Sequence, residues 1–171
     1  MIRIIMSGCN GHMGQVISGL VKDDPEAEIV AGIDLVDNRD NGYPVFTNIN
    51  DCDVQADVVV DFASAKAVDG LLDYCESHGV PLVLCTTGLS EEQVRRVGAA
   101  AEKKLPLVLC TTGLSEEQLA QVAKASESTA VLRSANMSLG INTLLKLVQE
   151  AAKVLAGAGF DMEIVEKHHN Q

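Results

Sequence analysis

The chain has 171 residues, 47% of them apolar, and a formal net charge of −11. This length and composition suit one compact domain with a sizeable core and exclude a disordered chain. The negative charge disfavours nucleic acid and anionic membrane surfaces as partners, because both require basic patches that meet phosphates. No apolar run reaches the roughly 18 residues of a membrane span, so we expect a soluble, cytoplasmic protein.

Short apolar runs alternate with amphipathic stretches along the chain. The runs occupy residues 2–6, 28–33, 57–62, 82–85, 107–110 and 130–132, and they are typical of strands buried on both faces. Three groups of apolar residues form helical faces between or after them: Val16, Ile17, Leu20 and Val21; Val68, Leu71, Leu72 and Cys75; and Ile141, Leu144, Leu145, Val148, Ala152 and Leu155. Residues 37–50, rich in Asn, Asp, Gly and Pro, are predicted to form a loop. The alternation predicts an α/β fold with a doubly wound parallel sheet of the Rossmann type.

A glycine-rich stretch follows the first predicted strand. Gly8, Gly11 and Gly14 form GxxGxxG at the start of a predicted helix, where glycines permit a tight turn and close approach to a pyrophosphate. Asp34 ends the second predicted strand, at the position where a carboxylate binds the adenosine ribose. This favours NAD, although the nearby Arg39 would soften the preference against NADP. A glycine turn without a ligand is the alternative.

The segment PLVLCTTGLSEEQ occurs twice, at residues 81–93 and again at 106–118. Each copy predicts a strand, a Thr-Thr-Gly turn and a helix start capped by Ser90 or Ser115. A solenoid needs about three or more similar units, so a local duplication within a Rossmann domain is favoured. Either both copies join the parallel sheet, which then gains a strand, or one copy lies outside the usual order.

The five cysteines, Cys9, Cys52, Cys75, Cys85 and Cys110, form no CxxC pair, and we expect reduced thiols. Cys85 and Cys110 end the repeated strands, where a small buried side chain explains them better than a catalytic nucleophile. No spacing in the sequence indicates a metal site.

The ordered motifs SGCNGHMG, VVVDFASAKAV, VLCTTGLSEEQ, SANMSLGIN and EKHHN resemble the 4-hydroxy-tetrahydrodipicolinate reductase (dihydrodipicolinate reductase) family of diaminopimelate and lysine biosynthesis. The resemblance covers the chain apart from an extra 25 residues. It implies an oxidoreductase that uses NADH or NADPH, with NADH slightly favoured, on a small-molecule dicarboxylate. Members of this family are tetramers, so the resemblance also implies a possible homo-oligomer.

The resemblance assigns roles to residues of this sequence. The cofactor-binding positions are Gly8, Gly11, His12, Met13 and Gly14 in the phosphate turn; Asp34 at the ribose; Phe62 and Ser64 along the cofactor; either Thr86, Thr87 and Gly88 or Thr111, Thr112 and Gly113 near the nicotinamide ribose; and Ala135, Asn136 and Met137 at the nicotinamide ring. His168 matches the general acid and His169 matches a ligand of the substrate carboxylate. Without the resemblance, the two histidines would be assigned to a solvated pair or an adventitious metal site.

The resemblance also predicts the domain organisation. Residues 1–159 correspond to a dinucleotide-binding domain, and residues 160–171 to the start of a truncated substrate domain. The alternating pattern at 161–164 suits the first strand of that domain, but its partner strands are missing, so we expect residues from about 160 onward to be frayed or paired with another chain. In the family, a lysine and a Ser-Gly-Thr-containing loop follow the histidine pair, and the sequence ends at Gln171 before them. We therefore expect weak turnover by this chain alone. The alternatives are a non-catalytic dinucleotide-binding module and a different Rossmann oxidoreductase, such as one acting on a 2-hydroxy acid.

Overall fold

The computed structural model describes residues 1–134 and 136–165. The chain forms two compact units, one ending at residue 135 and the other beginning at Asn136, and each is described by itself. These two units are defined by contacts and do not test the predicted functional domains, residues 1–159 and 160–171, which stay a prediction.

Within the described residues, the first unit contains strands and helices in alternation. The strands are β1 (Ile2–Ser7), β2 (Ala27–Ile33), β3 (Val45–Phe46), β4 (Val58–Asp61), β5 (Leu82–Leu84), β6 (Leu107–Leu109) and β7 (Val131–Arg133). The helices are α1 (His12–Lys22), α2 (Ala65–His78), α3 (Glu91–Glu102) and α4 (Glu116–Ala125), with a 3-10 turn, η1 (Ile49–Asp51). The six strands predicted from continuous apolar runs are therefore all present.

The seven strands form one parallel sheet in the order β3-β2-β1-β4-β5-β6-β7. The predicted doubly wound Rossmann fold is confirmed. A Rossmann sheet usually has the six-stranded order 3-2-1-4-5-6, so this sheet continues that order by one strand.

The prediction of a loop over residues 37–50 is wrong in part. Val45 and Phe46 form the edge strand β3, which pairs with Gly32 and Ile33 of β2. The two-residue strand is too short to produce an alternating pattern, and the turn-forming residues around it concealed it.

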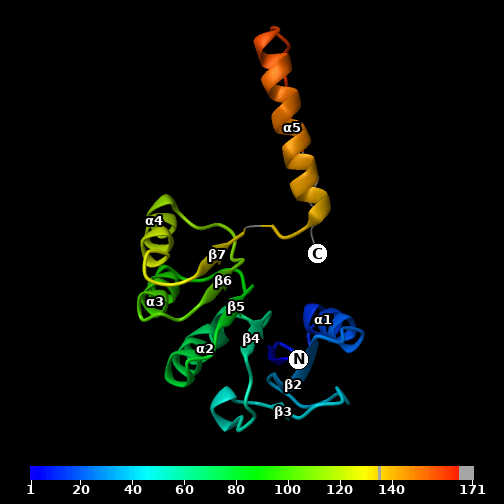
Figure 1. The fold of residues 1–171 in the computed structure, drawn as a ribbon, viewed down its shortest axis with the longest axis vertical. Helices are drawn as coiled ribbons and strands as arrows, with labels where there is room; N and C mark the ends of the chain where they lie inside the picture. Colours follow the sequence, from blue (N-terminus) through cyan, green and yellow to red (C-terminus); the bar gives the residue numbers. More distant parts are fainter. Residues whose placement is uncertain (135, 166–171) are drawn as a thin grey trace. The chain divides into compact units, whose positions relative to one another are not determined.

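The helices of the first unit cover both faces of the sheet. Figure 1 shows α2, α3 and α4 along one face and α1 on the other. The core lies beneath α2, α3 and α4, where inward-facing residues of β5 and β6 pack with the predicted apolar face of α2. The core residues from these elements are Leu82, Leu84, Leu107 and Leu109 with Val68, Leu71, Leu72 and Cys75.

Both copies of the repeat fold into strand, turn and helix within the sheet. Residues of β5 pair with their own counterparts in β6, in the register Leu82↔Leu107, Val83↔Val108 and Leu84↔Leu109. The predicted caps form, because the side chains of Ser90 and Ser115 each accept a hydrogen bond in a complete capping box. The duplication has therefore added a strand to the sheet.

The second unit contains the helix α5 (Leu139–Gly157), as its apolar periodicity predicts. Its start is fixed by Ser138, whose Oγ accepts a hydrogen bond from the backbone N–H of Ile141 at 3.3 Å. Residues 160–165 have no regular secondary structure, which agrees with the expectation that the segment at 161–164 does not form a strand without its partners. A strand requires a neighbour for its backbone hydrogen bonds, and the alternating pattern alone supplies none. Among the described residues, no helix is both long and apolar enough to cross a membrane.

Candidate cofactor-binding site

A cavity of about 480 Å³ lies where β1, β2 and β4 end. Five of the predicted cofactor-binding residues line it: Gly8, Gly11, Asp34, Phe62 and Ser64. The strand order reverses between β1 and β4, and ligands of open parallel sheets bind in the crevice outside the carboxyl ends at such a point. The sequence thus predicted residues that the fold brings to one cavity from three separate segments.

Close packing explains why glycines occupy the turn between β1 and α1. Gly8 has a φ of +79°, and a Cβ there would lie 2.9 Å from the backbone of Ala63. A Cβ on Gly14 would lie 2.2 Å from the carbonyl oxygen of Gly8. A side chain at Gly8 would push the turn away from the segment after β4, and a side chain at Gly14 would push α1 away from the turn.

The two helices that begin at this cavity have no side-chain caps. Gly11 is the N-cap of α1 and Ser64 the N-cap of α2, neither N-cap side chain makes a capping hydrogen bond, and neither first turn contains an acidic residue. The helices α3, α4 and α5, by contrast, are each capped by a serine hydroxyl. Uncapped N–H groups and the positive end of the helix dipole favour a bound anion, so this arrangement suits a pyrophosphate.

Asp34 is held in place by backbone amides. Its Oδ2 accepts a hydrogen bond from the N–H of Asn10 at 2.8 Å, and its Oδ1 accepts one from the N–H of Leu35 at 2.8 Å. An ionised carboxylate has about four acceptor positions, so two remain for the hydroxyl groups of a ribose.

Asn10 is a site residue that the sequence reasoning missed. Its Nδ2 donates to the carbonyl oxygen of Val36 at 2.6 Å, and its Oδ1 accepts from Nδ2 of Asn41 at 2.9 Å. These bonds connect the glycine turn to the segments after β2. Its position between two glycines of the motif was the available signal.

Apolar residues and one cation also line the cavity, together with the polar Ser7, Asn38 and Thr47. Ile33, Leu35, Val36, Ala63 and Ala67 line the cavity, which suits the flat face of an adenine ring. Arg39 lines the same cavity as Asp34, and it also lines an adjoining hollow with Gly11 and His12. A 2′-phosphate on the ribose would therefore meet both a carboxylate and a guanidinium.

A chain of buried hydrogen bonds joins β4 to both repeat turns. Oγ1 of Thr86 donates to Oδ2 of Asp61 at 2.6 Å, and Oγ1 of Thr111 donates to the carbonyl oxygen of Thr86 at 2.8 Å. Burial raises the pKa of Asp61, although hydrogen bonds from Thr86, Ser7 and the backbone of Ala63 oppose this shift. Thr86 is thus bonded to the end of β4, directly before Phe62, whereas Thr111 is one strand further away.

The remaining predicted residues lie outside this cavity. Met13 is 43% exposed on α1, and Thr87, Gly88, Thr112 and Gly113 are exposed in their turns. Asn136 and Met137 belong to the second unit, where the Oδ1 of Asn136 accepts a hydrogen bond from the N–H of Ser138 at 2.8 Å. Ala135, His168 and His169 lie outside the described residues.

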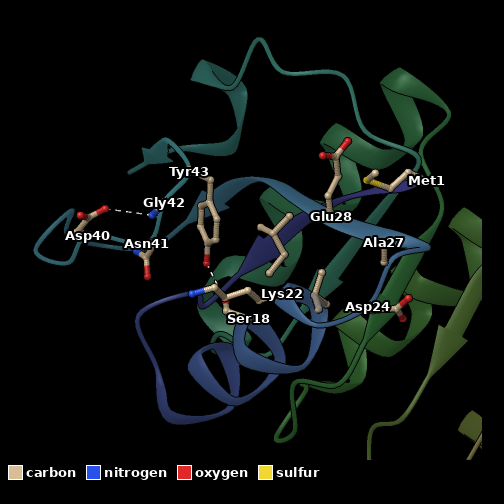
Figure 2. Close-up of a pocket in the computed structure, with 12 residues that line it drawn as sticks. Met1, Ser18, Lys22, Asp24, Ala27, Glu28, Asp40, Asn41, Gly42 and Tyr43 are labelled. Carbon is tan, nitrogen blue, oxygen red and sulfur yellow. Dashed lines mark hydrogen bonds between the residues drawn. The ribbon is translucent and has the colours of Figure 1, made fainter.

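A larger cavity of about 660 Å³ lies beside the first residues of β2 and the last turn of α1 (Figure 2). Ser18 and Tyr43 are hydrogen-bonded there at 2.9 Å, and Asp24, Glu28 and Asp40 contribute carboxylates. These negative charges disfavour a phosphate, and no predicted cofactor residue lines the cavity. Volume therefore does not identify the cofactor site.

Comparison with known families settles the relationship of the chain. A family model described as "Dihydrodipicolinate reductase, N-terminus" matches residues 2–105 and, separately, residues 94–137. The chain belongs to the dihydrodipicolinate reductase family. The second match contains the second copy of the repeat, so both copies carry the family's pattern.

Two curated relatives are 4-hydroxy-tetrahydrodipicolinate reductases from bacteria. The protein from Caldanaerobacter subterraneus subsp. tengcongensis is 45% identical over 170 residues, covering 99% of this chain and 57% of the relative. The protein from Clostridium novyi is 40% identical over 171 residues, covering 100% of this chain and 58% of the relative. The chain thus spans less than three fifths of the length of these relatives.

Solved structures with the same fold include a relative and a more distant dehydrogenase. The dipicolinate-bound dihydrodipicolinate reductase from Paenisporosarcina sp. TG-14 matches with a TM-score of 0.65 and 23% identity, covering 91% of this chain and 55% of that one. The scyllo-inositol dehydrogenase from Lactobacillus casei matches with a TM-score of 0.55 and 14% identity, covering 90% of this chain and 42% of that one. The family and the dinucleotide-binding fold support a nicotinamide dinucleotide as the cofactor of this member of the dihydrodipicolinate reductase family.

Proposed function

We propose that the chain binds NADH or NADPH in the cavity at the ends of β1, β2 and β4, as part of the reduction of 4-hydroxy-tetrahydrodipicolinate. The observation that carries the proposal is the pair of uncapped helix starts at Gly11 and Ser64, which border one cavity with Asp34. When bound, the nicotinamide supplies a hydride. Family membership and the names of the curated relatives support this choice of substrate, a small dicarboxylate.

Residues in and beside the cavity are assigned to different parts of the dinucleotide. The turn of Gly8, Gly11, His12, Met13 and Gly14 binds the pyrophosphate through backbone amides. Asp34 accepts hydrogen bonds from the adenosine ribose. Phe62 and Ser64 lie along the cofactor after β4.

The first copy of the repeat is the one we assign to the nicotinamide ribose. β5 adjoins β4, whereas β6 is one strand further along, and each strand adds about 4.8 Å. Thr86 is also hydrogen-bonded to Asp61 at the end of β4. Thr86, Thr87 and Gly88 are therefore better placed for this role than Thr111, Thr112 and Gly113.

The residues at the nicotinamide ring and at the substrate are assigned through the family resemblance. Ala135, Asn136 and Met137 hold the nicotinamide ring, His168 donates the proton, and His169 binds a substrate carboxylate. Histidine suits proton donation near neutral pH because its unperturbed pKa is about 6.5. A steady-state assay of NADH oxidation in the presence of substrate tests this part, and NADH binding without turnover would favour a dinucleotide-binding module.

NADH is the slightly favoured cofactor because Asp34 repels a 2′-phosphate, while Arg39 at the same cavity attracts one. Replacing Arg39 by Ala should therefore weaken NADPH binding more than NADH binding. Parallel titrations with the two cofactors measure the difference. Equal losses for both cofactors would remove Arg39 from the 2′ position.

Cofactor binding is tested by titrating the chain with NADH and following nicotinamide fluorescence, since the protein contains no tryptophan. Gly14→Ala should weaken binding by about tenfold or more, equivalent to about 1.4 kcal/mol, because the new Cβ collides with the carbonyl of Gly8. Gly19→Ala on the same helix is the matched control, because nothing lies within 4 Å of its Cβ. Gly11→Ala, whose Cβ meets only the Gly8 oxygen at 3.3 Å, tests the site if Gly14→Ala unfolds. Saturable binding that all three variants retain would contradict the proposal.

The assignment of the first copy has its own matched pair. Thr87 and Thr112 occupy equivalent exposed positions in identical turns, so Thr87→Ala and Thr112→Ala should affect folding equally. Thr87→Ala should weaken NADH binding about two- to tenfold, the value of one hydrogen bond, and Thr112→Ala should not. The reverse result would assign the cofactor to the second copy.

A further inference from the structure

The duplication has placed two cysteines side by side. Cys85 and Cys110 are the same residue in the two copies, each directly after its strand. Because β5 and β6 pair in register up to Leu84↔Leu109, the next residues of the two strands are neighbours as well. The backbone N–H of Cys110 donates to the carbonyl oxygen of Leu84 at 2.9 Å, which continues the pairing to this point.

The two thiols are close enough to influence each other, because the neighbouring Cys110 is among the groups that raise the pKa of the Cys85 thiol. Alternation along the strands sets both thiols on the opposite face of the sheet from Leu84 and Leu109, which are buried in the core. Both cysteines are half-buried, whereas Cys9, Cys52 and Cys75 are buried.

The spacing of the backbones also suits a covalent bond. Neighbouring strands lie about 4.8 Å apart, and Cα atoms joined by a disulfide are usually about 4.4–6.8 Å apart. Cys85 and Cys110 follow the last paired residues of β5 and β6, and their N–H groups still donate to the carbonyl oxygens of Asp61 at 3.0 Å and Leu84 at 2.9 Å. The small approach that a disulfide requires therefore comes from the side-chain torsions of the two cysteines.

We propose that Cys85 and Cys110 form a redox-active dithiol, which a small-molecule disulfide such as oxidised glutathione converts to a disulfide between β5 and β6. The thiolate of Cys110 attacks one sulfur of oxidised glutathione, forming a mixed disulfide and releasing one glutathione thiolate. The thiolate of Cys85 then attacks the Cys110 sulfur, which forms the Cys85–Cys110 bond and releases the second glutathione. Two electrons pass from the two cysteines to the oxidant, and their two protons pass to the released glutathione thiolates.

The order of the steps follows from the environment of Cys85. Burial, first, and then the neighbouring Cys110 and Asp61 raise the pKa of the Cys85 thiol to about 12. Cys85 is therefore a poor nucleophile toward a dissolved oxidant, because the thiolate is the reactive form. Attack on the adjacent mixed disulfide is intramolecular, and by then the Cys110 thiol, which contributes to the raised pKa after burial, has been consumed.

The proposal is tested on the full chain by incubation with oxidised glutathione, followed by thiol titration in denaturant and mass spectrometry. We expect the loss of two of the five thiols and of two hydrogens in mass, with all five thiols restored by dithiothreitol. Trypsin should release residues 67–95 joined to residues 105–124, and fragmentation should place the bond on Cys85 rather than Cys75.

Variants separate this dithiol from general thiol oxidation. Cys110→Ser should abolish the bond, and Cys85→Ser should stop the reaction at a glutathione adduct on Cys110. Cys52→Ala is the control and should still form the bond. A wild-type chain that does not react, carries only glutathione adducts, forms covalent dimers or joins Cys75 would overturn the proposal. This readout is independent of cofactor binding, so it stands or falls apart from the proposed reductase function.

Discussion

The two copies of the repeat fold alike but are surrounded differently. Gly88 and Gly113 have φ values of +74° and +75°, and both helices begin with a serine–glutamine capping box. The surroundings diverge at Gln93, whose Nε2 donates to the carbonyl oxygen of Ala65 at 2.6 Å on the neighbouring helix α2. Local interactions within thirteen residues set the turn and the caps, while the adjacent strand and helix set the other partners.

Burial shows the same contrast. Five residues of α3 are buried, against Val122 and Ala125 in α4. α3 lies between α2 and α4 along one face of the sheet (Figure 1). A duplicated segment therefore acquires a different environment simply because its position in the sheet differs.

Removing one copy is the strongest test of this comparison. Any 25-residue deletion that starts between residues 81 and 94 yields the same shortened chain, because the two segments are identical. We expect it to fold with the six-stranded Rossmann order, and its urea m-value should fall by roughly a seventh because less surface is exposed on unfolding. Loss of cooperative unfolding would show that both copies are needed for the sheet.

The next test replaces the equivalent leucines of β5 and β6. Leu84 is 0% exposed and Leu109 is 1% exposed, so Leu84→Ala and Leu109→Ala should each lower the free energy of unfolding by about 2–5 kcal/mol. Urea denaturation measures both. A cost below about 1 kcal/mol for Leu109→Ala alone would mean that the second copy is outside the core.

The repeated threonines should differ. Thr86→Val removes a hydrogen bond to the buried Asp61 carboxyl and should cost about 1–3 kcal/mol. Thr111→Val removes a bond to a carbonyl oxygen that has a second acceptor position, and should cost about 1 kcal/mol. The same denaturation experiment compares them, and equal costs would show that Asp61 does not distinguish the copies.

The smallest expected effect is the pH dependence of stability that Asp61 causes. Asp61 accepts a hydrogen bond from Thr86 of the first copy. A raised folded-state pKa stabilises the fold below the unfolded pKa of about 3.9, and this contribution is lost as the pH rises through the folded value. The unfolding free energy of the wild type should therefore fall relative to Asp61→Asn as the pH is raised above about 4.

Asp57 provides the control of opposite sign. Hydrogen bonds from Arg3 lower the pKa of Asp57 to about 2, so its contribution is present above the unfolded value and is lost as the pH falls toward 2. Denaturation curves at several pH values compare Asp57→Asn with Asp61→Asn. Parallel profiles for the two variants would contradict the burial of Asp61.

Much of the fold was predictable because its signals are local or periodic. Continuous apolar runs indicated six of the seven strands, and the serines of the repeat indicated two helix starts. The edge strand β3 was missed because two residues carry no period. The segment at 161–164 has the alternation of a strand but no partner strand, and residues 160–165 are irregular, as expected for an unpaired segment.

The candidate site was predictable where one motif carries it. Gly8, Gly11 and Asp34 followed from their spacing, and they line one cavity. Asn10 was missed because its role consists of hydrogen bonds to Val36 and Asn41, which are distant in sequence.

The amino-acid sequence by itself determined the Rossmann class, the glycine turn, the acid after β2 and the fact of a duplication, because these depend on residue type and spacing. Only the tertiary structure decided that both copies enter the sheet, that Thr86 and Thr111 take different partners, and that Cys85 and Cys110 lie on adjacent strands. The physical reason is that identical segments have identical local preferences. The order of strands then decides which neighbour each copy meets.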